Sequence, residues 1–188
     1  PEKLKNQEKS HGVLLLSCHY GLFYIYTIFF GKISNINNYN IYNKQKNINN
    51  FLYNTSYKNT YYIKTNNKIY NILNIKKKIV NMLCDHKYKK NNNEINFLNN
   101  KYKFQISPYY IYKKTNRKIW IFYSDYNIIN KKLIVSFEEL KNIDHLNQNQ
   151  ITQKIADHFS EKILNNPSQY LWVHDIFGIK NTIKNKNK

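Results

Sequence analysis

Arginine is almost absent from this chain. Arg117 stands alone among 188 residues, although lysine brings the formal net charge to +19 at pH 7. Arginine makes the bidentate contacts that read phosphates and base edges, so its scarcity counts against sequence-specific nucleic-acid recognition. Scattered lysines and 18 tyrosines leave open a basic nucleic-acid- or ribosome-associated protein, because lysine neutralises phosphates and aromatic rings stack on bases. Most of these lysines are expected to be ordinary solvated surface. Among functional interpretations, we favour a basic face that lies against an anionic membrane surface.

Cysteine and glycine are scarce too. The two cysteines, Cys18 and Cys84, lie far apart in the sequence, which excludes a disulfide framework and a cysteine-based zinc site. The four glycines form no phosphate-binding loop. We therefore expect neither a metal nor a diffusible cofactor.

The apolar content is sufficient for one domain with a hydrophobic core. The 188 residues are 41% hydrophobic, which is typical of a folded chain, but the chain is too short for two domains. We expect a single domain over residues 1–180 and a frayed, basic tail over 181–188. Because the sequence begins at Pro1 and not at methionine, we also expect a missing N-terminal segment that carries an anchor.

An uncharged run, GVLLLSCHYGLFYIYTIFFG, covers residues 12–31. As a single helix it would be long enough to span a bilayer. A polar cluster at residues 17–19 makes a lipid-facing span less attractive. We favour a buried strand at 13–17, a turn at 19–21 and a buried helix at 22–30.

Further elements follow from hydrophobic patterning. Strands are predicted at residues 39–42, 79–85, 118–123 and 133–137, and a shorter one is predicted to begin at Phe97. Helices are predicted at residues 68–75, 107–114 and 148–164. In the second of these helices Ser107 is the expected N-cap and Pro108 lies in the first turn. Alternating strands and helices predict an α/β domain, with helices flanking a mixed, mostly parallel sheet.

Two of the predicted central strands end in polar residues. In a parallel sheet, functional sites gather beyond the carboxyl ends of the strands, where this sequence places His19 and Asp85. A histidine in an apolar recess can accept a hydroxyl proton at neutral pH. An unpaired buried carboxylate is costly, so Asp85 is expected to belong to the site.

Three motifs resemble those of the bacterial lipid A late acyltransferases. Residues 12–24, GVLLLSCHYGLFY, are similar to a strand followed by H-x-G-N-W-E. The apolar run that ends at Asp85 resembles the family's strand ending in aspartate. Residues 166–174, NPSQYLWVH, resemble the closing motif P-x-Q-(W/Y)-L-W-x-H. The motifs occur in the family's order and cover nearly the whole chain.

The resemblance implies a glycerolipid-acyltransferase-like fold and an acyl transfer reaction. The donor would be a thioester of acyl carrier protein, and the acceptor a hydroxyl of a lipid A precursor. His19 would act as general base, oriented by an acid five residues later (H-x4-D/E), as the carboxylate orients histidine in a serine-protease triad. The protein would act at the cytoplasmic face of the inner membrane.

The chain departs from the family pattern at polar positions. The usual acid is replaced by Tyr24, and Tyr42 is followed by Asn43 where the family has arginine. The expected catalytic residues are His19, Tyr24 and Asp85, and the expected substrate-binding residues are Gly21, Tyr42, Asn43 and His174. Two hypotheses remain: a working enzyme in which Asp85 or Asp125 supplies the missing charge, or a catalytically inactive homologue.

Overall fold

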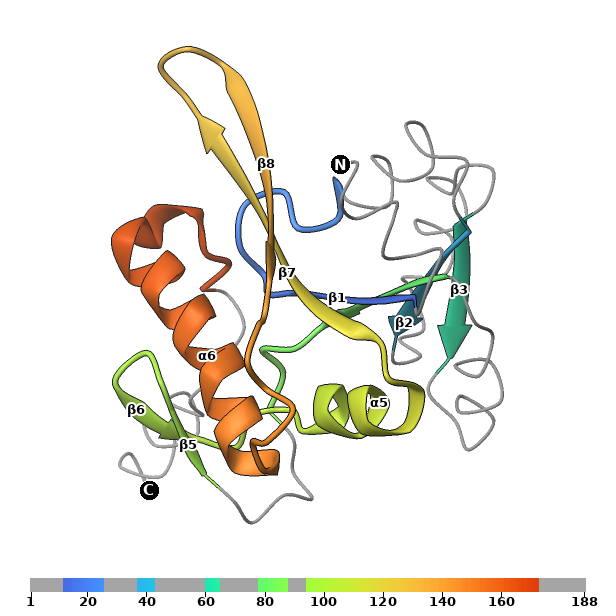
Figure 1. Ribbon diagram of the computed structural model, residues 1–188. Coiled ribbons are helices and arrows are strands. Elements are labelled where there is room, and N and C mark those ends of the chain that lie inside the picture. The colour runs from blue at the N-terminus through green and yellow to red at the C-terminus, as the bar shows by residue number, and fades with distance from the viewer. Residues whose placement is uncertain (1–11, 26–36, 43–59, 65–77, 88–93, 173–188) are drawn as a thin grey trace, which may run out of the picture.

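A six-stranded mixed sheet forms the centre of the molecule (Figure 1). The computed structural model describes residues 12–25, 37–42, 60–64, 78–87 and 94–172. Across the sheet the strands follow the order β3 (Thr60–Lys64), β2 (Asn38–Tyr42), β4 (Ile79–Leu83), β1 (Val13–Ser17), β7 (Lys118–Asn127) and β8 (Lys132–Glu139). The first five are parallel, and β8 runs antiparallel to β7. The predicted α/β class with a mostly parallel sheet is confirmed.

Strand β1 occupies the middle of this sheet. It pairs with β4 on one side and β7 on the other, and all five of its residues are buried. A strand covered on both faces needs a continuous apolar run, which explains the sequence VLLLS. A single membrane-spanning helix over residues 12–31 is therefore wrong, because Val13–Ser17 is a strand. The buried helix predicted at 22–30 does not begin at residue 22, because residues 22–24 form a bend and a turn and Tyr24 is exposed, while residues 26–30 lie outside the described residues.

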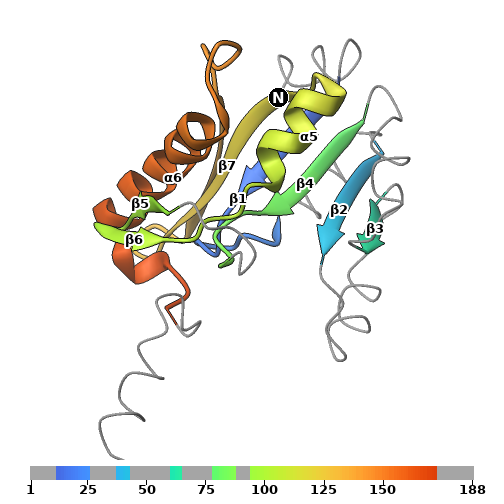
Figure 2. The same cartoon turned by 90° about the horizontal axis from the view of Figure 1, so that it is seen from below.

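Two helices cover one face of the sheet (Figure 2). They are α5 (Ser107–Thr115) and α6 (Gln148–Asn165), and the buried side of α6 shares a core cluster with Leu14 and Leu16 of β1. A short hairpin of β5 (Ile95–Phe97) and β6 (Asn100–Tyr102) packs against α6. Neither of the helices within these described ranges has the length and apolar character to cross a bilayer.

The opposite face of the sheet has a second, smaller core. Val13 and Leu15 of β1 alternate with the leucines of the first core and cluster with Trp120 and Phe122 of β7. Successive side chains of a strand point to opposite faces, so β1 contributes to both cores. This double burial fixes the position of the residues that follow β1.

Most of the predicted elements are present. The strands predicted at 39–42, 79–85, 118–123 and 133–137 are confirmed, as are the helices at 107–114 and 148–164, although β4 ends at Leu83 and β7 and β8 are longer than predicted. The short strand predicted to begin at Phe97 instead ends there, as β5. Strand β3 was not predicted. The predictions for residues 68–75 and 181–188 lie outside the described residues.

The prediction that Ser107 caps α5 is wrong. The N-cap is Ile106, whose side chain cannot accept a hydrogen bond, while the Ser107 hydroxyl accepts one from Gln105 Nε2 at 3.3 Å. Pro108 lies in the first turn as predicted. Proline is preorganised for a helix start because its fixed φ matches the helix and its missing N–H needs no partner there.

Helix α6 begins with a capping box. Asn147 Oδ1 accepts a hydrogen bond from Gln150 N at 3.0 Å, and Gln150 Oε1 accepts one from Asn147 N at 2.9 Å. These two bonds satisfy backbone donors that a helix start leaves without partners. They stabilise the element that leads directly into the closing motif.

We expect Asn147→Ala to lower the free energy of unfolding by about 1 kcal/mol, because it removes the acceptor of this cap. Urea denaturation followed by circular dichroism measures the change. Asn147→Ser, which keeps an acceptor, should stay close to the parent protein. An equal loss in both variants would contradict a capping role.

Candidate active site

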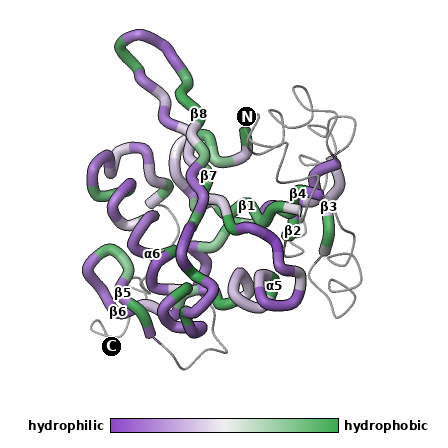
Figure 3. Tube along the Cα trace, viewed as in Figure 1, coloured by the Kyte–Doolittle hydropathy of each residue, from purple (hydrophilic) through white to green (hydrophobic). Residues whose placement is uncertain are grey.

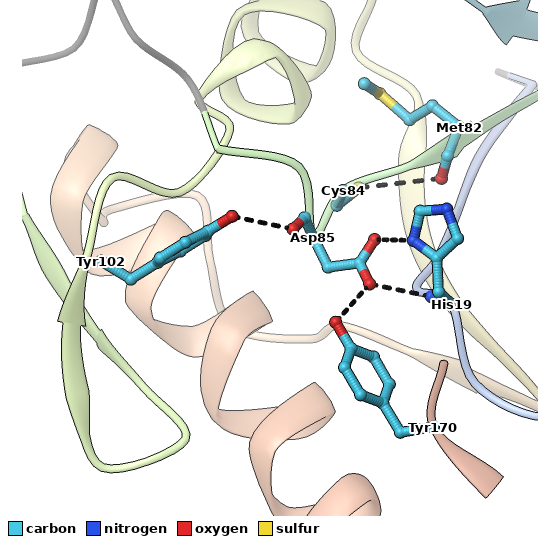
Figure 4. A network of polar contacts seen from close by, with 6 residues as sticks. All are labelled: His19, Met82, Cys84, Asp85, Tyr102 and Tyr170. Carbon is cyan, nitrogen blue, oxygen red and sulfur yellow. Dashed lines mark hydrogen bonds and ion pairs between the residues drawn. The ribbon is translucent and has the colours of Figure 1, made fainter. Parts of the chain in front are cut away.

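The paired ends of β1 and β4 bring His19 and Asp85 together. The two parallel strands are aligned through Ser17 and Leu83, and Cys84 N continues the ladder by donating to Ser17 O at 2.9 Å. His19 and Asp85 each lie two residues beyond the aligned pair. The imidazole Nδ1 then lies 2.8 Å from Asp85 Oδ1, and the His19 backbone N–H donates to Oδ2 at 2.9 Å (Figure 4).

The Asp85 carboxylate is buried but richly hydrogen-bonded. Its side chain is 1% exposed, and Oδ2 also accepts a hydrogen bond from the Tyr170 hydroxyl at 2.8 Å. Burial alone raises the pKa of Asp85, but the hydrogen bonds and charge of His19 and the bond from Tyr170 outweigh it and hold the pKa below its usual value. Asp85 is therefore ionised at neutral pH.

This geometry assigns the tautomer of the neutral imidazole. A carboxylate can only accept, so Nδ1 carries the proton and Nε2 carries the lone pair. Figure 4 shows Nε2 on the side of the ring away from the carboxylate. Two rings pack edge-on against the imidazole: Phe23, with centroids 4.9 Å apart, and His86, at 4.8 Å. The pair therefore has the form of a general base held by a buried acid.

The closing motif lies beside His19. After the 3₁₀ helix η1 (Pro167–Gln169), the chain forms an isolated bridge with the turn that follows β1. Gly21 N donates to Gln169 O at 2.8 Å, and Leu171 N donates to His19 O at 2.9 Å. These backbone bonds place Tyr170 over Asp85, which ties the end of the described chain to its beginning.

Tyr170 was not predicted to belong to the site. The side chain is buried, with 4% exposed, but its hydroxyl is the third donor to Asp85. Tyr102 was also missed, and its hydroxyl donates to the Asp85 backbone carbonyl at 3.1 Å. A buried tyrosine needs a partner for its hydroxyl, and the tyrosine of the closing motif is the one signal that could have suggested this contact.

Gly21, predicted to bind substrate, has a position in the fold that no other residue fits. Its φ is +58°, and a Cβ at this position would lie 1.7 Å from the carbonyl oxygen of Ser124 on β7. The turn after β1 thus rests directly on the backbone of β7. This close approach explains the glycine of the first motif in steric terms.

The other predicted residues are Tyr24, Tyr42, Asn43, His174 and the alternative acid Asp125. Tyr24 follows Phe23, packs edge-on against its ring at 5.6 Å and is 43% exposed. Tyr42 ends β2, while Asn43 and His174 lie outside the described residues. Asp125, the alternative acid, accepts a hydrogen bond from the Tyr20 hydroxyl and pairs with Lys162, each at 2.7 Å. Asp85 is the acid that the structure places on the imidazole.

Among the residues that the structure describes, no group of three histidines, cysteines or acids is arranged to hold a metal. A groove of about 760 Å³ lies on β7, β8 and α6, with Trp120, Phe137 and His158 in its wall. Neither His19 nor Asp85 lines it. The groove is separate from the histidine–aspartate pair.

One comparison with known proteins identifies a family for this chain. A family model described as bacterial lipid A biosynthesis acyltransferase matches residues 2–178. No curated protein matches the chain. The family match includes both strand ends and the closing motif.

We expect Gly21→Ala to destabilise the fold severely, because the new methyl group would collide with a backbone oxygen that cannot move aside. Gly12→Ala is the matched control: Gly12 has a similarly positive φ of +79°, but its nearest neighbour would be 3.0 Å away. Thermal unfolding should show a markedly larger loss for Gly21→Ala. Equal losses would mean that backbone strain alone, and not the contact with β7, requires Gly21.

Asp85 should also contribute to the pH dependence of stability. Its folded-state pKa lies below the ordinary value of 3.8, so its stabilising effect is present above that value and is lost as the pH falls through the folded-state pKa. We expect the stability difference between the parent protein and Asp85→Asn to shrink as the pH falls below about 4. Urea unfolding over a pH series tests this, and a difference that widens in acid would contradict it.

Proposed function

The chain belongs to the bacterial lipid A biosynthesis acyltransferase family, and we propose that it moves a fatty acyl group from a thioester to a hydroxyl of a lipid A precursor through His19 and Asp85. The observation that carries this proposal is the 2.8 Å contact between His19 Nδ1 and a buried carboxylate. It joins two motifs that lie 66 residues apart.

His19 Nε2 removes the proton from the acceptor hydroxyl as its oxygen attacks the thioester carbonyl. The tetrahedral intermediate collapses, the carbon–sulfur bond breaks, and the leaving thiolate recovers the proton from the imidazolium. Asp85 keeps its negative charge throughout. It holds the ring in the Nδ1–H tautomer and stabilises the imidazolium, which is the role of the carboxylate in a serine-protease triad.

Asp85 compensates in this account for the acid that Tyr24 replaces. A phenol is uncharged at pH 7, so Tyr24 cannot stabilise an imidazolium as a carboxylate does. Asp85 is charged, buried and already in contact with the ring. Electrostatic stabilisation is strongest where water is excluded, which favours this buried carboxylate over the half-exposed Tyr24.

The finer assignments rest on the motifs and on charge. Acyl carrier protein is the proposed donor, and the cytoplasmic face of the inner membrane is the proposed site of action, because the three motifs resemble those of the late acyltransferases. A net charge of +19 supports an anionic membrane surface as a partner. Gly21, Tyr42, Asn43 and His174 remain the proposed substrate-binding residues.

Acyl transfer from acyl carrier protein to a lipid A precursor in detergent micelles tests the proposal. We expect Asp85→Asn to lower the rate constant for transfer by about 10³- to 10⁴-fold, as neutralising a triad carboxylate does, and His19→Ala to lower it at least as much. Tyr170→Phe should cost about ten-fold, since it removes one hydrogen bond to a charged group.

Tyr24→Phe is the matched control for Tyr170→Phe, because both remove one hydroxyl from an aromatic ring. It should leave transfer close to the parent rate, since Asp85 is the acid on the imidazole. Unchanged transfer in His19→Ala would sink the assignment of the base. Absence of transfer in the parent protein, with gain of transfer in Tyr24→Glu, would favour the inactive homologue.

A further inference from the structure

The β7–β8 hairpin extends well beyond the body of the molecule (Figure 1). Pairing between β1 and β7 runs as far as Leu16 and Ile121, and β7 then continues to Asn127 before β8 returns from Lys132. Because β7 is parallel to β1, this extension leaves the sheet at its carboxyl edge. His19 and Asp85 lie at the same edge.

The tip of the hairpin exposes large apolar side chains. Ile129 is 96% exposed and Ile128 is 79% exposed, more than any other large hydrophobic residue in the described ranges. Ile134 and Tyr126, on the strands beside the tip, are also exposed. Figure 3 shows hydrophobic and hydrophilic residues side by side along this hairpin. Clustered exposed apolar groups mark a surface that contacts a partner or a membrane.

The charge around the tip has one sign. Residues 126–137 include Lys131 and Lys132 and contain no aspartate or glutamate. The nearest acid, Asp125, lies opposite Ile134 at the base of the hairpin and is paired with Lys162. Ile128 and Ile129 at the tip lie close in sequence to these two lysines, with no acid within the tip itself, which matches an anionic lipid interface: the apolar groups enter the acyl boundary and the ammonium groups meet the headgroups.

Three backbone N–H groups of the tip are hydrogen-bonded within the tip, as an environment with little water requires. Asn127 Oδ1 accepts hydrogen bonds from Ile129 N at 3.0 Å and Asn130 N at 3.2 Å, and Asn130 Oδ1 accepts one from Lys132 N at 3.1 Å. A backbone donor that leaves water without a partner is costly. The two asparagines satisfy these donors within the tip itself.

Hydrogen bonds connect the base of the hairpin to the turn after β1, which carries His19. Asp125 accepts the hydrogen bond from Tyr20, the residue next to His19. The side chain of Gln169 binds both backbone groups of the next residue, Tyr126. Gln169 Oε1 accepts a hydrogen bond from Tyr126 N at 2.9 Å, and Gln169 Nε2 donates one to Tyr126 O at 3.1 Å. These contacts join the base of the hairpin to the turn that carries His19 and to the closing motif.

The closing motif adds exposed apolar residues near His19. Leu171, whose backbone bonds to His19, is 37% exposed, and Trp172 is 50% exposed. Tryptophan is favoured at the membrane–water interface. The carboxyl edge thus presents apolar groups both beside the imidazole and at the hairpin tip.

We propose that the tip of the β7–β8 hairpin, residues 126–134, inserts into the interface of an anionic lipid bilayer and holds the His19 edge of the sheet against that surface. The inference deepens the proposed function and rests on it, because an acceptor anchored in a bilayer presents its headgroup and upper acyl chain at this interface. The hairpin would bring the general base to an acceptor that does not leave the membrane.

Vesicle binding by the full chain tests the insertion without turnover. Liposomes of phosphatidylcholine with phosphatidylglycerol are compared with liposomes of phosphatidylcholine alone, by co-sedimentation. The double variant Ile128→Ser, Ile129→Ser should bind the anionic vesicles at least about ten-fold more weakly. Lys131→Gln with Lys132→Gln should weaken binding by about 30-fold. Both sites are exposed, so circular dichroism should show unchanged folding.

Two controls match these changes elsewhere on the surface. Leu164→Ser removes a half-exposed apolar side chain from α6, and Lys113→Gln with Lys114→Gln removes the same charge from α5. Both should bind within about two-fold of the parent protein. If the lysine pair on α5 matters as much as the pair at the tip, binding follows overall charge and the inference is wrong.

The remaining outcomes separate this inference from the proposed function. The double serine variant should lose transfer to an acceptor in vesicles but keep transfer to the same acceptor in micelles. His19→Ala should bind vesicles like the parent protein. Unchanged vesicle binding by the serine variant would overturn the inference while leaving the proposed function standing. A parent dimer that the serine variant converts to a monomer would assign the tip to a second copy of the chain and also overturn it.

Discussion

A buried carboxylate must be paired, and the pairing of Asp85 organises this molecule. The side chain has almost no contact with water, so its charge depends on the His19 ring, the His19 backbone and the Tyr170 hydroxyl. These donors come from the end of β1 and from the motif after α6. The parallel register of β1 and β4, the turn at Gly21 and the path of the closing segment all serve to bring them to one point.

The elements around this point could be predicted because their signals are local. The leucines of β1 form a continuous apolar run, as a doubly covered strand requires, and α6 shows a clear helical repeat before Pro167. The rule that sites gather at the carboxyl ends of parallel strands then selected His19 and Asp85. Their contact requires β1 and β4 to be neighbours in the sheet, and hydrophobic patterning does not determine which strands are neighbours.

Other features depend on tertiary contacts that no local pattern records. The hydrogen bond from Tyr170 to Asp85 joins positions 85 residues apart, and the steric requirement for Gly21 depends on how closely β7 passes. Serine is a common N-cap residue, but Ser107 is already the first residue of the helix and Ile106 is the N-cap. Tyr24 stands where the family has an acid, which suggested that His19 lacks its carboxylate partner. The fold instead places the charged carboxylate of Asp85 on the His19 ring.

The central claim is that Asp85 fixes the protonation pattern of the His19 imidazole. Nitrogen-15 NMR of the histidine rings reads this pattern directly, with His19→Gln used to assign the signal. The neutral ring should carry its proton on Nδ1 in the parent protein, and Asp85→Asn should shift the ring toward the Nε2–H form or a mixture. A parent ring that is already protonated on Nε2, or a tautomer that Asp85→Asn leaves unchanged, would contradict the account.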